Sequence, residues 1–204
     1  METTAQFSVW MLLLCIVAGY LIGNIQTAII ISKFRYHDDV RNHGSGNAGS
    51  TNMVRVFGYR PGLLTFVGDF VKAVLAVIVG RLLMGTYGGY AAGFFVVIGH
   101  CFPVFAGFRG GKGVASSFGV AWMVFPLGAA ITTVVIVIVL ALSKRVSLMS
   151  LIGMVAFFIT TIIFKWGTDM YLILLAFALL VVVYLRHTEN IKRLIRGEEK
   201  QLVN

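Results

Sequence analysis

The sequence predicts an all-α polytopic membrane protein, and its composition and hydropathy carry that prediction. Of the 204 residues, 58% are hydrophobic and 12% are charged, whereas a soluble domain carries about 25% charged residues. The mean hydropathy of +0.90 agrees. A soluble fold of this size cannot bury so much apolar surface, because much of a small fold stays in contact with solvent. We therefore exclude an ordinary soluble enzyme, a disordered chain and a fibrous chain, and expect a single domain over residues 1–204.

Seven membrane segments are expected along the chain. The first continues for about 25 largely apolar residues, which is too long for the core of a signal peptide. A long polar loop over 32–61 follows it, and a polar tail begins at Arg186. The expected segments are Ser8–Ile31, Gly62–Met84, Gly88–Phe105, two short helices within Val114–Leu142, Leu151–Phe164 and Met170–Leu185.

The segment Val114–Leu142 is either one helix or a hairpin around Pro126. The hairpin places 14 of the 17 lysines and arginines on one side of the membrane, as the positive-inside rule requires of the cytoplasmic side. We therefore expect the hairpin, with the N-terminus outside and the C-terminus in the cytoplasm. Each of its helices would have about a dozen residues, fewer than the roughly 20 that normally cross a bilayer.

The net charge of +9 has two explanations. Basic loops can face anionic lipid headgroups, or they can bind an anionic substrate. We expect a membrane lipid environment and no nucleic-acid partner, because the chain is so apolar. Cys15 and Cys101 both lie in apolar surroundings, so no disulfide framework, metal site or cofactor is expected.

Two glycine-rich segments are candidate phosphate sites. In Gly44–Arg55, three glycines alternate with small polar side chains before an arginine, a composition suited to binding an anion through backbone N–H groups. An ordinary turn-rich loop is about equally compatible. In Gly99–Gly113, glycines surround Arg109 and Lys112 before a helix start that would aim N–H groups at an anion. A basic loop that only fixes topology explains the cations but not the glycines, and His100 is more simply a packed polar residue.

Three further groups of polar residues have structural alternatives. Ser147 and Ser150 follow Lys144–Arg145, where a helix cap with a topology signal is the favoured interpretation. His187 and Asn190 lie three apart in a basic tail, which fits a ligand role and an amphipathic tail on lipid equally well. Asp69 and Lys72 lie three apart within a span, where we favour a structural ion pair over a functional one.

Together the four segments resemble the bacterial membrane acyl-phosphate:glycerol-3-phosphate acyltransferases. The resemblance covers the chain in order and spacing. It rests on Gly-Ser-Gly-Asn-x-Gly-x-Thr-Asn-x-x-Arg (44–55), Gly-His-x-x-Pro-x-Phe-x-x-Phe-x-Gly-Gly-Lys-Gly (99–113), Lys-Arg-x-Ser-Leu-x-Ser (144–150), Arg-His-x-x-Asn-Ile-x-Arg-Leu (186–194) and Asp-x-x-Lys (69–72). Arg109 stands where lysine is usual, and Arg145 where an aromatic residue is frequent.

The resemblance implies a reaction and a location. A fatty acyl phosphate donates its acyl chain to the 1-hydroxyl of sn-glycerol 3-phosphate, giving lysophosphatidic acid and inorganic phosphate. The family folds as seven transmembrane helices in the bacterial inner membrane and uses neither acyl-CoA nor acyl carrier protein directly. The active site would face the cytoplasm, and no obligate protein partner is expected.

Residue roles follow as hypotheses. Ser45, Asn47, Thr51, Asn52 and Arg55 would clamp the acyl phosphate, while Lys112, Ser147, His187 and Asn190 would hold glycerol 3-phosphate. Gly49, Gly99, His100, Gly110 and Gly111 complete the expected substrate-binding set. Arg55, Lys112, Ser147 and His187 are the expected catalytic residues. The proton of the attacking hydroxyl would pass to His187 or to the donor's own phosphate.

Two rival functions remain open. A membrane transporter of phosphorylated solutes shares the spans and the cationic sites, but it predicts polar residues along a path through mid-membrane. A phosphatidyl transferase needs clustered aspartates for a metal, and only Asp38 and Asp39 are adjacent.

Overall fold

The computed structural model describes residues 9–202, which form helices and no strands, so the all-α prediction is confirmed. The α-helices are α1 (Val9–Gly23), α2 (Thr27–Tyr36), α3 (Ser50–Phe57), α4 (Tyr59–Cys101), α5 (Val114–Val124), α6 (Pro126–Ser143), α7 (Val146–Lys165), α8 (Met170–Arg186) and α9 (Thr188–Ile195). Two 3-10 helices, η1 (Val40–Asn42) and η2 (Val104–Ala106), lie in the connections. Within the described residues, 4 helical segments are long and apolar enough to cross a membrane, or up to 5 if the bent pair α8–α9 is one span.

The second and third expected spans form one element, α4, that folds back on itself. Met84 and Gly85 leave helical geometry, and Gly85 takes a positive φ of 62°. The two halves then pack closely, because a Cβ on Gly80 would lie 2.2 Å from the carbonyl oxygen of Gly88. The expected boundary between these two spans is therefore found, although the third span ends at Cys101 rather than Phe105.

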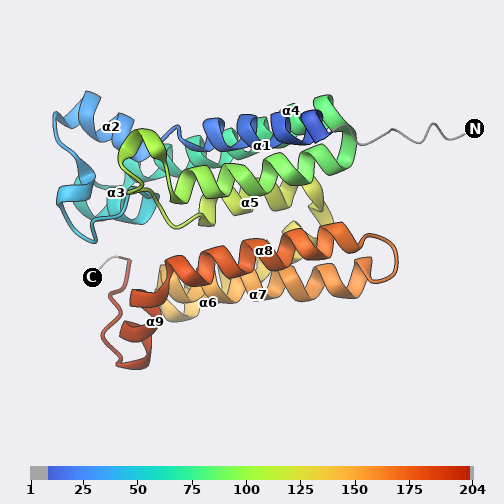
Figure 1. The fold of residues 1–204 in the computed structure, drawn as a ribbon. Helices are drawn as coiled ribbons and strands as arrows, with labels where there is room; N and C mark the ends of the chain where they lie inside the picture. Colours follow the sequence, from blue (N-terminus) through green and yellow to red (C-terminus); the bar gives the residue numbers. More distant parts are fainter. Residues whose placement is uncertain (1–8, 203–204) are drawn as a thin grey trace, which may run out of the picture.

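The break that was expected at Pro126 is present. Phe125 leaves helical geometry, with φ −149° and ψ 79°, and Pro126 occupies the first turn of α6, where its fixed φ and missing N–H are tolerated. Helices α5 and α6 run in opposite directions on either side of this break (Figure 1). With 11 residues, α5 is about 16 Å long and cannot cross a bilayer alone. Its partner α6 has 18 residues, so the two hairpin helices are not equally short as expected.

The first expected span is interrupted, which the sequence analysis did not predict. Helix α1 ends at Gly23 and α2 begins at Thr27, while the expected start at Ser8 lies outside the described residues. The ammonium of Lys72 donates to the carbonyl oxygens of Gly23 (3.2 Å) and Ile25 (2.6 Å) at the break. Carbonyl groups without a helical partner need such donors in an apolar environment. The loop expected over 32–61 also contains the end of α2, η1 and α3.

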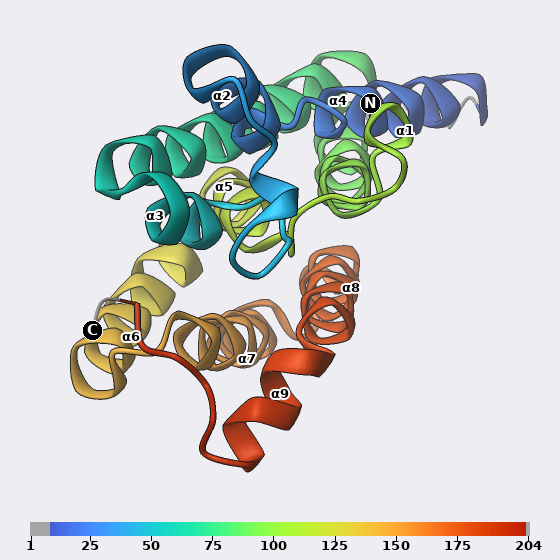
Figure 2. The same cartoon turned by 90° about the vertical axis from the view of Figure 1, so that its left-hand side faces the viewer.

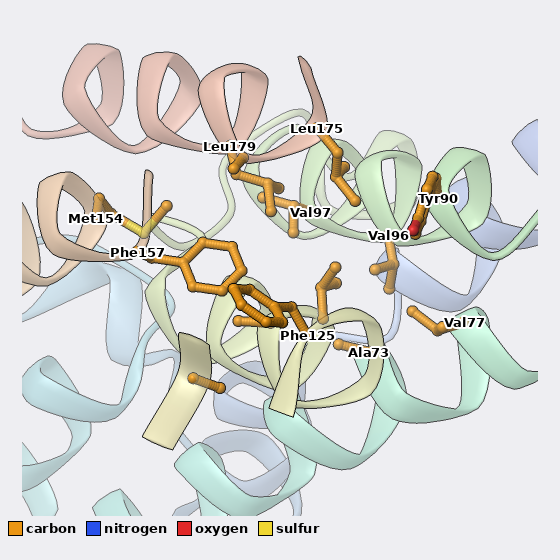
Figure 3. Packing of buried hydrophobic residues seen from close by; sticks show 14 of the residues in the cluster. Ala73, Val77, Tyr90, Val96, Val97, Phe125, Met154, Phe157, Leu175 and Leu179 are labelled. Carbon is orange, nitrogen blue, oxygen red and sulfur yellow. The ribbon is translucent and has the colours of Figure 1, made fainter. Parts of the chain in front are cut away.

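The bundle gathers its polar connections at one end. Helices α2, α3 and α9 lie together there, whereas α1 begins near the other end (Figure 1). Viewed along the bundle, α1, α4 and α5 form one group and α7 and α8 lie opposite them (Figure 2). A core of buried side chains from α4, α5, α7, α8 and the α5–α6 break, including Val97, Phe125, Phe157 and Leu179, joins the groups (Figure 3). The four motifs are therefore held at one end by a packed helical core.

Candidate functional site

A cavity of about 150 Å³ lies at this end of the bundle, and all four motifs line it. Its walls come from the loop before α3, the end of α4, the start of α5, the start of α7 and the α8–α9 junction. Ten of the expected site residues line it: Ser45, Asn47, Gly49, Thr51, Arg55, His100, Lys112, Ser147, His187 and Asn190. Residues up to 154 positions apart in the chain thus meet at one site.

Asn52 holds the first loop in shape and is not among the cavity-lining residues. Its side chain is buried; Oδ1 accepts the backbone N–H of Ser45 at 2.9 Å. Its amide nitrogen contacts the carbonyl oxygens of Val40, His43 and Asn47, each at 3.1 Å. All of these bonds are to backbone groups of the same loop. The structure therefore places Asn52 behind Ser45 and Asn47 rather than beside them at the site.

Three glycines of the second motif serve close packing and also lie outside the cavity lining. A Cβ on Gly110 would lie 2.0 Å from the carbonyl oxygen of His100, and one on Gly111 would lie 2.2 Å from His100 Nε2. Gly99 packs in the same way on the backbone of Tyr20. The carbonyl oxygens of Gly110 and Gly111 accept hydrogen bonds from the Arg186 guanidinium. Lack of side chains at these positions lets the loop lie directly against α4 and present Lys112.

Lys112 is a partly buried ammonium among other cations. Its Nζ donates a hydrogen bond to Asn190 Oδ1. Burial lowers the pKa of Lys112 to about 8; Glu199 opposes the change, and the positive charges of Arg193 and Arg55 reinforce it. An incoming phosphate would restore the missing counter-charge, because a nearby anion favours the protonated amine. Lys112 is therefore suited to binding an anion.

His187 is neutral at physiological pH and has a defined orientation. Its Nδ1 lies 2.8 Å from the carbonyl oxygen of Val183, and a carbonyl can only accept, so Nδ1 carries the proton and Nε2 is an acceptor. Burial, followed by the charge of Lys112, lowers the pKa of His187 to about 4. A neutral imidazole with a free Nε2 at the cavity wall can accept a hydrogen bond from a substrate hydroxyl.

Glu199 is a site residue that the sequence analysis missed. It lines the cavity and is 6% exposed; it accepts hydrogen bonds from Asn190 Nδ2 (2.6 Å) and Arg193 Nε (2.7 Å). Burial raises the pKa of Glu199, but side-chain hydrogen bonds from Arg193, Ser147 and Asn190 outweigh it, and the net pKa is lowered. The available signal was a lone acidic pair, Glu198–Glu199, in a basic tail. A turn at Gly197, rather than the periodicity of a helix, returns Glu199 to the site, so residue spacing could not predict its position.

Asp69 and Lys72 form the expected ion pair. Lys72 Nζ lies 2.9 Å from Asp69 Oδ1, and the two side chains are 4% and 2% exposed. Lys72 also lies 2.9 Å from His100 Nδ1, and the Thr27 hydroxyl donates to Asp69. The pair ties α4 to the α1–α2 break and to the second motif, so its contacts agree with the structural interpretation of both the pair and His100. Asp69 also reaches the cavity wall, a placement that the sequence analysis did not foresee.

Asp38 and Asp39 are engaged in local ion pairs. Asp39 binds Arg41 at 2.7 Å, and Asp38 lies 2.7 Å from His43 Nε2. Hydrogen bonding from Arg41 lowers the pKa of Asp39 to about 2. Over residues 9–202, no group of three or more His, Cys, Asp or Glu side chains is placed to hold a metal ion.

Comparison with known proteins identifies the family. The sequence profile described as Glycerol-3-phosphate acyltransferase matches residues 13–197. The chain belongs to this glycerol-3-phosphate acyltransferase family. Glycerol-3-phosphate acyltransferases of Thermoanaerobacter sp. (strain X514) and Alkaliphilus metalliredigens are 45% and 40% identical to it, covering 91% and 93% of this chain and 93% and 95% of theirs. The resemblance noted from the four motifs is thus confirmed.

Solved structures of the same family share the fold. The crystal structure of PlsY (YgiH), an integral membrane glycerol 3-phosphate acyltransferase, in its glycerol 3-phosphate form is 33% identical and superposes with a TM-score of 0.87, covering 93% of this chain and 94% of that one. Its lysophosphatidic acid form gives 0.84 at 31% identity over the same shares. The chain is accordingly an acyltransferase of integral membrane type.

Proposed function

We propose that the protein transfers a fatty acyl group from acyl phosphate to the 1-hydroxyl of sn-glycerol 3-phosphate. The products are 1-acyl-sn-glycerol 3-phosphate and inorganic phosphate, which serve phospholipid synthesis. One observation carries the proposal: the polar cavity that holds Arg55 and Lys112 lies directly beside an apolar one. The second cavity, of about 230 Å³, shares Phe66, Val114, Met149 and Ser150 with the first. A phosphate and an acyl chain can therefore occupy adjoining sites.

The two phosphates would bind to different walls of the polar cavity. Ser45, Asn47, Thr51 and Arg55 lie together on the loop before α3 and on α3 itself, and we assign them to the acyl phosphate. Lys112, Ser147, His187 and Asn190 line the cavity from the loop before α5, the start of α7 and the α8–α9 junction, and we assign them to glycerol 3-phosphate. Glu199 orients Asn190 and Arg193 through its hydrogen bonds. The role of Asn52 becomes that of positioning Ser45 and Asn47.

The reaction needs no acyl-enzyme. The 1-hydroxyl oxygen forms a bond to the acyl carbon, and the bond from that carbon to the phosphate oxygen breaks, releasing phosphate. Arg55 and Lys112 would neutralise charge that grows on the departing phosphate and on the oxyanion, and the cavity would fix the distance between the reactants. The hydroxyl proton would move to Nε2 of the neutral His187 or to the leaving phosphate.

The site would face the cytoplasm of a bacterial inner membrane. Arg81 and Lys165 belong to the far end of the bundle, beside the turn at Phe125, where Arg81 donates to the Met123 carbonyl and Lys165 lies over the Phe125 ring. Most other cations belong to α2, α3, α9 and the neighbouring connections at the site end, which supports a cytoplasmic site under the positive-inside rule. Together with the hairpin at Pro126, the same distribution supports seven membrane segments with the N-terminus outside.

The decisive assay uses purified protein in lipid nanodiscs, palmitoyl phosphate and labelled glycerol 3-phosphate. We expect labelled lysophosphatidic acid and one phosphate released per ester formed, and no product with palmitoyl-CoA as the donor. Transfer from acyl-CoA but not from acyl phosphate would contradict the assigned donor. Uptake of glycerol 3-phosphate into sealed vesicles without ester formation would instead support the transporter.

A further inference from the structure

The apolar cavity has a closed deep end. It runs between α5, α6 and α7, and its lining follows each helix away from the polar site. Along α7 the lining begins at Met149 and ends at Phe157, and along α5 it begins at Val114 and ends at Ala121. The last residues on each helix, Ala121 and Phe157, are buried members of the main core. The cavity therefore stops where the packed core begins.

Phe157 forms this end wall. It is 2% exposed and belongs to the same core cluster as Phe125 and Met154 (Figure 3). Phe125 is itself held in place by Gly128, where a Cβ would lie 2.3 Å from the Phe125 ring. Phe125 and Phe157 thus lie in the same packed core (Figure 3), and Phe157 faces neither lipid nor open space. A chain that enters from the polar site meets a rigid wall, because packed cores yield little to extra volume.

We infer that Phe157, with Ala121 opposite, is an acyl-chain-length determinant of this enzyme. From Ser147 at the polar site to Phe157, about ten residues of α7 rise roughly 15 Å. A zigzag of carbon–carbon bonds of about 1.5 Å advances roughly 1.25 Å per carbon, so about twelve carbons fill this depth. Longer chains must bend out towards α6, where Val137 lines the same cavity and is 60% exposed. This inference rests on the proposed function, since it assumes an acyl donor.

A bilayer dissolves short and long acyl chains alike, so any chain-length preference of the enzyme must come from the shape of the cavity. Competition between two donors measures that preference directly. Equal mole fractions of dodecanoyl and hexadecanoyl phosphate in one nanodisc preparation would compete for glycerol 3-phosphate, and mass spectrometry would give the product ratio. Phe157→Ala should shift the ratio towards the hexadecanoyl product by about threefold or more, since pockets discriminate modestly per methylene. Ala121→Val, which fills the end of the cavity, should shift it the other way.

Matched variants keep the test interpretable. Ile159 lies on the same helix but is 49% exposed, so Ile159→Ala should leave the ratio unchanged. Phe157→Leu is the milder form if Phe157→Ala does not fold, and it should shift the ratio in the same direction. Active Phe157 and Ala121 variants with the wild-type ratio would overturn the inference while leaving the proposed function intact. Wild-type protein that transfers no acyl group from either donor would overturn the proposed function, and this inference with it.

Discussion

The pKa of a cationic side chain in the site depends on its surroundings, as Lys112 shows. Its pKa of about 8 reflects burial among other positive charges, so it is mostly protonated at pH 7. As pH rises through this value, the free enzyme loses the charge that would bind a phosphate.

The apparent KM for glycerol 3-phosphate should therefore rise above pH 8, and kcat should fall as well, because the same charge would stabilise the transition state. Arginine stays protonated throughout this range, so Lys112→Arg should move the rise to higher pH or remove it, even if KM is higher overall. Steady-state kinetics between pH 6 and 10 check this prediction. An unchanged profile in Lys112→Arg would assign the titration to another group.

Arg55 should govern the acyl-phosphate side. Charge-assisted hydrogen bonds contribute about 1.5–3 kcal/mol, so Arg55→Ala should raise KM for acyl phosphate by roughly ten- to hundredfold. KM for glycerol 3-phosphate should change little, and exposed Arg60 gives the control variant Arg60→Ala. Full activity of Arg55→Ala at limiting acyl phosphate would remove Arg55 from the clamp.

The buried ion pair allows a test by double substitution. Removing one member of a buried pair leaves an uncompensated charge and costs about 3–5 kcal/mol. Asp69→Asn and Lys72→Met should each sharply lower the thermal midpoint of the detergent-solubilised protein. The thermal midpoint of the double variant should fall by less than the sum of the decreases in the two single variants. Additive losses would show that the pair is not coupled.

At the scale of elements, the glycine-rich loop depends on close approach to α4. Gly110→Ala would place a methyl group 2.0 Å from the backbone oxygen of His100, and backbone cannot move aside as a flexible side chain can. We expect a loss of about 1–3 kcal/mol in stability, as for overpacked sites. No atom lies within 4 Å of a Cβ on Gly49, so Gly49→Ala should leave the thermal midpoint unchanged. A similar decrease in the thermal midpoint of Gly110→Ala and Gly49→Ala would contradict the role of close packing.

The positions of some helix breaks could be predicted from the sequence, and the positions of others could not. The hairpin at Pro126 was predictable because a proline and the distribution of charges gave the same answer. The break between α1 and α2 was not, because it depends on Lys72, which is remote in sequence and supplies hydrogen bonds to Gly23 and Ile25. Likewise, the composition of Gly99–Gly113 predicts a phosphate-binding loop. Only the structure shows that Gly110 and Gly111 serve to pack the loop against His100, while Lys112 lines the cavity.

At the scale of the molecule, the arrangement of polar ends gives a topology that can be measured. Thr168 lies in the α7–α8 connection and Lys200 in the tail near the site, and both are exposed. The native Cys15 and Cys101 are buried, so they should not react with a membrane-impermeant maleimide. In intact cells Thr168→Cys should be labelled and Lys200→Cys should be labelled only after lysis. The reverse pattern would place the site outside.

At this scale, most of the cavity lining was predictable from the sequence, because four short motifs supply it. Glu199 was not, since its position depends on a tail that turns back at Gly197 and on a hydrogen bond between Leu202 and Lys144. The sequence predicts Asn52 in the clamp itself, whereas its side chain bonds to backbone groups of the loop before α3. An asparagine that binds backbone and one that binds a ligand look alike in sequence.

The spacing of Asp69 and Lys72 has a consequence for how the protein enters the membrane. Both charges belong to one helix and lie one turn apart, so they can neutralise each other before any other helix has packed. The first half of α4 can then partition into the bilayer as an electrically neutral segment, at a lower cost than an isolated charge would incur. When α1 and α2 pack against α4, the Lys72 ammonium can still donate hydrogen bonds to the carbonyl oxygens of Gly23 and Ile25. The same side chain therefore lowers the cost of insertion and stabilises the assembled bundle.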